Sequence, residues 1–142
     1  MADNATARAW LAGQGFAEGD LRSEITINNK KRCPMAWASQ KGELGVCKWL
    51  HENGAAEDVS KANSQGFTPM ILACQEGHLS VCKWLFEVGA AVDITKADNG
   101  GFTPMRRTFS VPVMHWLVLK GALVEPTSED EHVVKNLSLI HI

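Results

Sequence analysis

The sequence lacks the features that mark membrane-spanning, secreted and strongly charged proteins. Its apolar runs fall short of the roughly 20 residues that a membrane-spanning helix needs. Its first residues, MADNATARAWLAGQGF, lack a basic segment followed by an apolar one. The formal net charge is only -2 at pH 7, so no field of one sign attracts nucleic acid or an acidic membrane. We therefore expect a soluble protein of the cytoplasm or the nucleus, with no membrane or nucleic-acid partner.

Cysteine is scarce and is not arranged for disulfides. The chain has four cysteines, and they stand among apolar residues rather than in loop pairs, at Cys33, Cys47, Cys74 and Cys82. This placement is typical of unpaired thiols in a reducing compartment.

The motifs of known enzyme classes are also missing. The chain has no glycine-rich phosphate loop after a strand, no HExxH, no CxxC and no paired acidic motif. Cys74, His78 and Cys82 have the spacing of zinc ligands on one helical face. Cys47 and His51 have the spacing of a thiolate and its base. Because His78 falls at a predicted turn and Cys47 repeats at an apolar position, we favour buried thiols and expect no metal, cofactor or catalytic site.

What the sequence does contain is an internal repeat of 35 residues, the spacing of Pro34, Pro69 and Pro104. The segment FTPM occurs at 67–70 and 102–105, with CPM at the matching place at 33–35. VCKWL occurs at 46–50 and 81–85, and GAA at 54–56 and 89–91. Chance does not produce so many matches in one register, so the chain is a repeat protein.

Each unit predicts a pair of helices. Thr68 and Thr103 can cap a first helix with their hydroxyls, and the proline that follows each fits the first helical position. A second helix is predicted over 79–88, with apolar residues at helical spacing, and it ends at Gly89. The polar stretch 90–101 predicts an extended finger or hairpin that leads to the next pair. One pair cannot bury its apolar face alone, so the pairs must stack.

At this point the pattern resembles the ankyrin family. The family's TPLHxA start, inter-helix Gly-His and closing Gly-Ala appear here as Thr68-Pro69-Met70, Gly77-His78 and Gly89-Ala90. The resemblance covers roughly residues 28–122 and, more weakly, the N-terminus. It implies an all-α fold, an ankyrin-type helical repeat solenoid.

We predict about three repeats behind an N-terminal half-repeat cap. The expected divisions are a cap with its linker at 1–27, repeat 1 at 28–62, repeat 2 at 63–97, a degenerate third repeat at 98–126 and an acidic tail at 127–142. The tail ends in LSLIHI, which we interpret either as a translated library adapter or as a native end that is a short helix or disordered.

The third repeat departs most from the pattern. Nine residues lead from Pro104 to Val113, whereas twelve lead from Pro69 to Val81. We therefore expect a first helix that is cut short and a second helix that Pro112 opens at Val113. In the first repeat a cysteine replaces the capping threonine, and loss of such a cap costs about 1 kcal/mol.

Aromatic and basic residues recur at matching places, and each set has a structural and a functional interpretation. Trp49, Trp84 and Trp116, with Trp10 as an echo, could line a ligand site, but a stacked core is favoured because buried aromatics supply large apolar area. The basic clusters at 30–32 and 106–107 could bind nucleic acid or phosphopeptides. We favour solvated loops, because no stacking aromatics interleave with them.

Recognition is expected on the finger tips and on the outward positions of the first helices, because loops on a rigid stack vary without disturbing the core. The resemblance implies the same concave surface. Arg32, Phe67 and Phe102 stand at matching tips and are candidate anchors, unless both phenylalanine rings fold back onto neighbouring repeats. The predicted partner-binding residues are Asn29, Lys30, Arg32, Gln40, Lys41, Ser64, Gln65, Phe67, Gln75, Glu76, Asn99, Gly100, Phe102 and Arg106.

The function that follows is that of a non-enzymatic, monomeric protein-protein interaction module, a scaffold or adaptor with a protein partner. Two alternatives stay open. The chain could be a fragment or targeting domain of a larger multi-repeat or enzyme-bearing protein, or it could be a structural element that extends a longer solenoid. The sequence does not identify the partner, because such scaffolds take their function from the side chains that they display.

Overall fold

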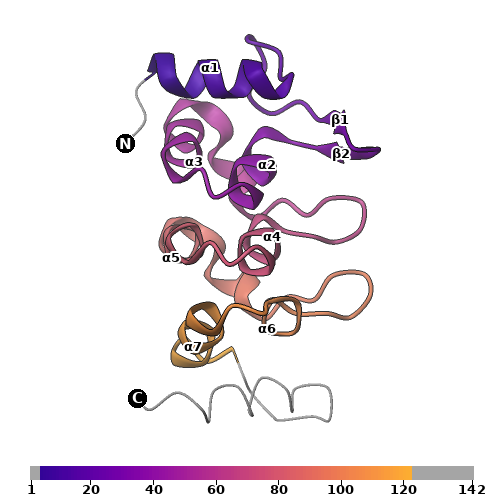
Figure 1. The fold of residues 1–142 in the computed structure, drawn as a ribbon, viewed down its shortest axis with the longest axis vertical. Helices are drawn as coiled ribbons and strands as arrows, with labels where there is room; N and C mark the ends of the chain where they lie inside the picture. The colour runs from indigo at the N-terminus through magenta and orange to yellow at the C-terminus, as the bar shows by residue number, and fades with distance from the viewer. Residues whose placement is uncertain (1–3, 123–142) are drawn as a thin grey trace.

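The computed structural model describes residues 4–122 and shows a stack of helix pairs with fingers on one side (Figure 1). The acidic tail predicted at 127–142, with its LSLIHI ending, lies outside the described residues. Helix α1 (Asn4–Gln14) comes first. The pairs are α2 (Pro34–Gln40) with α3 (Leu44–Leu50), α4 (Pro69–Gln75) with α5 (Leu79–Leu85), and α6 (Pro104–Arg107) with α7 (Val111–Leu119).

The pairs stack in two columns. Helices α2, α4 and α6 contact one another in succession, as do α3, α5 and α7, and α1 packs on α3. The predicted helical repeat solenoid is therefore confirmed. Within residues 4–122 no helix is both long and apolar enough to cross a membrane.

The first helices begin where the threonine-proline pairs predict, but the two threonines act differently. The Thr68 hydroxyl accepts a hydrogen bond from the Ile71 N–H at 3.2 Å, so the predicted cap of α4 is confirmed. Thr103 makes no such bond, and the prediction is wrong there. In its place the Arg106 N–H bonds to the main-chain carbonyl of Thr103 at 3.0 Å, which leaves the hydroxyl no donor at that position.

The second helices end at glycine, as predicted. Helix α5 continues without a break into the turn η3 (Phe86–Ala90), and the backbone leaves helical conformation at Gly89, whose φ is 129°. The earlier pair repeats this arrangement with η1 (His51–Ala55). Short 3-10 turns follow each of them, at η2 (Ala56–Ser60) and η4 (Ala91–Ile94). They lead the chain back toward the next finger.

The first finger is a β-hairpin, so the predicted all-α class is wrong for this segment. Strand β1 (Ile25–Ile27) pairs antiparallel with β2 (Lys30–Arg32). Asn28 and Asn29 form the turn between them, with φ of 53° and 66°. A two-residue turn with both central residues at positive φ matches the twist of a hairpin, and asparagine tolerates that region better than most residues.

The second and third fingers, at 63–67 and 98–102, are held by side chains in place of strand pairing. The Asn63 Oδ1 accepts hydrogen bonds from the N–H groups of Gln65 and Phe67, at 2.9 and 3.0 Å. At the matching position in the next finger, the Asp98 Oδ1 accepts from the N–H groups of Gly100 and Phe102, at 2.9 and 3.2 Å. Both fingers therefore have a fixed backbone shape.

The third helix pair is shortened, much as its sequence predicts. Helix α6 has four residues, and Pro112 stands at the start of α7. The predicted start at Val113 is two residues late, because the Ser110 hydroxyl accepts from the Val113 N–H and caps a helix that begins at Val111.

The repeated tryptophans lie in the core, which confirms the structural interpretation. Trp49, Trp84 and Trp116 are 5%, 9% and 6% exposed. The rings of His51 and Phe86, at matching places in consecutive repeats, each meet the tryptophan of the next repeat edge-on, at 5.7 and 5.8 Å between centroids. These contacts hold each repeat to its neighbour, and they make His51 a half-buried residue of the stack.

Candidate binding surface

All three fingers project from the first helices toward the same side of the molecule (Figure 1). The predicted partner-binding residues lie on these fingers and at the ends of α2, α4 and α6. We call this surface the recognition face. It comprises the predicted residues together with four others that the structure adds to them, which are Trp37, Asp98, Arg107 and Phe109.

Two open hollows mark the recognition face. The finger hollow, of about 400 Å³, has residues of all three fingers in its lining, which comprises Lys30, Ser64, Gln65, Phe67, Asp98, Asn99, Gly100 and Arg107. The terminal hollow, of about 410 Å³, is lined by Gln75, Glu76, Phe102, Arg106, Arg107 and Phe109. Arg107 borders both, so the two hollows adjoin.

Arg107 organises the space between the hollows. Its guanidinium carbon lies 5.1 Å from the ring centre of Phe67 and 4.4 Å from that of Phe102. The same guanidinium pairs with the Asp98 carboxylate, with the Nη2–Oδ2 and Nε–Oδ2 distances both 2.7 Å. Phe67 therefore leans onto the next repeat and is half-buried, whereas Phe102 remains 38% exposed.

The Asp98 carboxylate is buried but well satisfied. Burial raises the pKa of Asp98, yet the N–H of Phe102, the Arg107 side chain and the N–H of Gly100 together outweigh it. The net result is a pKa below the usual value. Asp98 is therefore ionised at neutral pH and holds Arg107 in place.

The second and third fingers are tied to each other through Asn99. Its N–H donates to the Gln65 carbonyl and its side-chain amide donates to the Ser64 carbonyl, both at 3.0 Å. Two bonds between adjacent tips fix their spacing. A ligand that binds across these tips meets a surface that is already ordered, which reduces the entropy lost on binding.

The first finger carries a separate cluster around Trp37. The Arg32 guanidinium carbon and the Lys41 Nζ lie 4.8 and 4.6 Å from the centre of that ring. Arg32 also donates to the Gln40 side-chain oxygen, and the Trp37 Nε1–H donates to Gln14 at 2.8 Å. Three of these side chains come from the first finger and α2, and Lys41 directly follows α2, so one helix pair builds most of the cluster.

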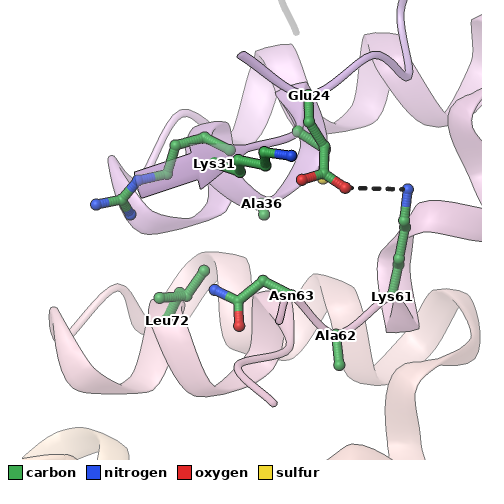
Figure 2. A pocket seen from close by; sticks show the side chains of 9 residues that line it. Glu24, Lys31, Ala36, Lys61, Ala62, Asn63 and Leu72 are labelled. Carbon is green, nitrogen blue, oxygen red and sulfur yellow. Dashed lines mark ion pairs between the residues drawn. The ribbon is translucent and has the colours of Figure 1, made fainter. Parts of the chain in front are cut away.

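A small cavity lies between the first and second fingers, behind the tips (Figure 2). Ala36 and Leu72 contribute apolar side chains to its lining. Glu24 and Lys61 form an ion pair at its edge, with 3.9 Å between Oε1 and Nζ. Its volume of about 10 Å³ is that of roughly one water molecule, so it is not a site for a small-molecule ligand.

Two of the added residues were missed by sequence reasoning for identifiable reasons. Arg107 looked like half of a solvated basic pair, because its ion pair with Asp98 depends on how the finger folds. Phe109 is 81% exposed beside the terminal hollow because the missing residues of the third repeat shorten α6. That shortening was visible in the sequence, and it could have drawn attention to the aromatic residue beside it.

The residues with the spacing of zinc ligands, Cys74, His78 and Cys82, are packed within and between the helix pairs. The Sγ atoms of Cys74 and Cys82 lie 3.3 Å apart and both residues are fully buried. The Cys82 side chain and burial raise the pKa of the Cys74 thiol. His78 precedes α5, with its ring against Gly42 of the preceding pair. Among residues 4–122, no group of three or more histidine, cysteine or acidic side chains is placed to hold a metal ion.

Cys47 and His51 are not arranged as a nucleophile and its base. Burial raises the pKa of the Cys47 thiol to about 12, and its sulfur lies 3.6 Å from the Ser39 hydroxyl. The His51 ring packs against Trp84. At neutral pH this thiol is protonated and shielded from solvent.

The comparisons with known proteins agree with the repeat and the fold. No curated protein matches the chain. The family model described as ankyrin repeats (3 copies) matches residues 4–105, from the start of α1 into α6. The match covers well over half of the 142 residues, and the chain belongs to the ankyrin repeat family.

Proposed function

We propose that this chain is a non-enzymatic interaction module that binds a protein partner through the recognition face. The observation that supports this most is the terminal hollow, where Phe102 and Phe109 are 38% and 81% exposed beside Arg106 and Arg107. Aromatic and arginine side chains supply a large share of the energy at protein interfaces. Exposed apolar patches that are rimmed by polar side chains often mark interaction sites.

The shape of the surface favours a macromolecular partner over a small molecule. Both hollows are open to solvent and lie next to each other, and together they span the three fingers and the ends of two first helices. Small-molecule sites are concave and bury most of their ligand. A peptide segment or a protein surface can cover both hollows at once.

A selection from a displayed library of random peptides tests this proposal without assuming the partner. We expect the full chain to enrich specific sequences, and we expect these to bind much more weakly to a Phe102→Ala, Phe109→Ala variant. The matched control is Val92→Ala, Leu119→Ala, because these apolar side chains are 77% and 69% exposed and line neither hollow.

The selection has two outcomes that contradict the proposal. One is that no sequence is enriched over the library. The other is that the control variant loses as much binding as the Phe102 and Phe109 variant while circular dichroism shows all three proteins equally helical.

A further inference from the structure

The recognition face has an excess of positive charge that the whole chain does not share. Its charged side chains are Lys30, Arg32, Lys41, Glu76, Asp98, Arg106 and Arg107. The net charge of the full sequence is -2. Of the two carboxylates on the face, Asp98 is neutralised by Arg107. The field over this face is therefore opposite in sign to that of the chain as a whole, and it attracts anionic groups.

The strongest local feature is the pair of cations at Trp37. Arg32 and Lys41 both approach this ring within 5 Å, and neither forms an ion pair with a carboxylate in the described part of the chain. A cation over an indole ring is stabilised, but two cations at the same ring repel each other. An anionic side chain placed beside both would offset that repulsion.

Arg32 has hydrogen-bonding capacity that its neighbours do not use. A guanidinium has five N–H donors in a planar fork that suits a carboxylate. Within residues 4–122, the bond from Arg32 to Gln40 goes to a neutral amide, and the Arg32 Nε is buried without a hydrogen-bond partner. Burial lowers the pKa of Arg32. This is the environment of a charge that lacks its counter-ion.

We propose that the recognition face binds an acidic peptide segment of the partner protein, with a carboxylate held by Arg32 and Lys41. This inference rests on the proposed function and identifies the chemistry of its partner. Lys30, on the next stretch of the same face, offers a second position for a carboxylate beside the finger hollow. Phe102 and Phe109 at the far end favour an apolar side chain of the segment.

A single-stranded nucleic acid is also anionic, but the face suits it less well. Such ligands are held by bases that stack on open aromatic rings. Here the half-buried Phe67 ring is stacked on Arg107, and Trp37 is only 4% exposed beneath its two cations. Trp37, the ring next to Arg32 and Lys41, is therefore not open to a base, and the observations favour a peptide.

Fluorescence anisotropy with three labelled probes tests the inference on the full chain. The first probe is a glutamate-rich peptide of about 12 residues with leucines near one end, which spans about 40 Å when extended. The second has glutamine in place of every glutamate, and the third is an oligothymidine of similar length. We expect the acidic peptide to bind, to weaken as salt rises, and to bind more tightly than the other two.

A pair of charge-matched variants locates the site. Arg32→Gln, Lys41→Gln is expected to weaken the acidic peptide by about tenfold or more. Lys48→Gln, Lys83→Gln removes the same charge from α3 and α5, and it is expected to change the affinity by less than about twofold. The acidic residues at 129–131 lie outside the described residues and could compete with the probe. The affinity of the wild-type chain and of each variant is therefore also measured with neutral residues at those three positions.

Several results would overturn the inference. They are equal binding of the glutamine peptide, tighter binding of oligothymidine, no binding of the acidic peptide in either background, or an equal loss in the Lys48 and Lys83 variant. Failure here is distinct from failure of the proposed function. If the random-peptide selection yields neutral or basic sequences that depend on Phe102 and Phe109, the interaction module stands and the acidic partner does not.

Discussion

Asp58 and Asp93 occupy the same position in consecutive repeats, and neutralising them is expected to have opposite effects on stability. Both are buried, at 0% and 2% exposed. The Asp58 carboxylate is bound by Arg22, with the Nη2–Oδ1 distance 2.8 Å and both Nε–O distances 3.2 Å. Among the residues that the structure describes, the Oδ2 of Asp93 has no hydrogen-bond partner. Asparagine has nearly the same shape as aspartate, so Asp58→Asn and Asp93→Asn isolate the effect of the charge.

The loss expected for Asp58→Asn follows from its contacts. Hydrogen bonds to charged groups contribute about 1.5–3 kcal/mol. The Arg22 side chain is 46% exposed, so water recovers part of what the guanidinium loses. We therefore expect the free energy of unfolding at pH 7 to fall by about 2 kcal/mol.

The sign is different for Asp93 because its ionised form is disfavoured in the fold. Burial raises the pKa of Asp93 by more than the Ser60 side chain and the Lys96 charge lower it. A raised carboxyl pKa means that stability falls as the pH rises from the unfolded value, about 3.9, through the folded one. Asp93→Asn removes this loss. At pH 7 we expect no destabilisation and a gain of up to about 1 kcal/mol.

Urea unfolding followed by circular dichroism at pH 7 and at about pH 3.5 measures both effects. The gain from Asp93→Asn should shrink at the lower pH, where the wild-type carboxyl is protonated. If Asp93→Asn costs as much as Asp58→Asn at pH 7, the two carboxylates have the same structural role and our reasoning about Asp93 is refuted.

Three further predictions compare matched positions or states. In urea unfolding, Thr68→Ala should lower the free energy of unfolding by about 1 kcal/mol or more because it removes a helix cap. Thr103→Ala should lower it by less than half as much, because the Thr103 hydroxyl caps no helix. Gly42→Ala should cost about 2 kcal/mol in the same assay, since φ is 74° and the new Cβ would lie 2.6 Å from a histidine ring of the next pair. Gly121→Ala, at φ 85° with no atom of residues 4–122 within 4 Å of the new Cβ, should cost about 1 kcal/mol. An equal loss at both sites would contradict the close contact at Gly42. The Cys47 thiol, with its pKa raised to about 12, should resist iodoacetamide at about pH 8 in the folded chain and react in urea. Mass spectrometry measures the labelling. Rapid labelling of the folded chain would show that this thiol is not buried.

Much of the fold could be predicted because its signals are local. The prolines after Thr68 and Thr103 fix where first helices start, and Gly89 fixes where a second helix ends, whatever lies around them. What could not be predicted depends on neighbours. The Thr103 hydroxyl is a plausible cap in the sequence, and only the tight turn of α6 takes away its donor.

The candidate surface shows the same division. The sequence placed the predicted residues on the fingers and helix ends, because their positions follow from the repeat alone. The state of each side chain does not follow from the repeat. Arg107 is fixed by Asp98 and two rings because the third finger folds toward it. Its neighbour Arg106 lies 5.0 Å from the Phe102 ring centre and donates to the Gly101 carbonyl at 3.3 Å. Whether any of these residues binds a partner stays a prediction.

The shortened third repeat has a consequence for the binding surface. In the second repeat α4 has seven residues, whereas α6 has four. The chain after α6 is therefore not helical, and it leaves Phe109 exposed next to Phe102 and Arg106. A departure from the repeat pattern thus exposes the Phe109 ring on the recognition face, at the end where we expect an apolar side chain of the partner.

Hydrogen-deuterium exchange of the full chain, with and without a peptide from the random selection, tests the central claim most directly. The account predicts that the peptide slows exchange in the second and third fingers and at the ends of α4 and α6, where the two hollows lie. Exchange in α3, α5 and α7 should stay unchanged. Protection confined to those second helices, with none in the fingers, would contradict the claim that this chain binds its partner through the recognition face.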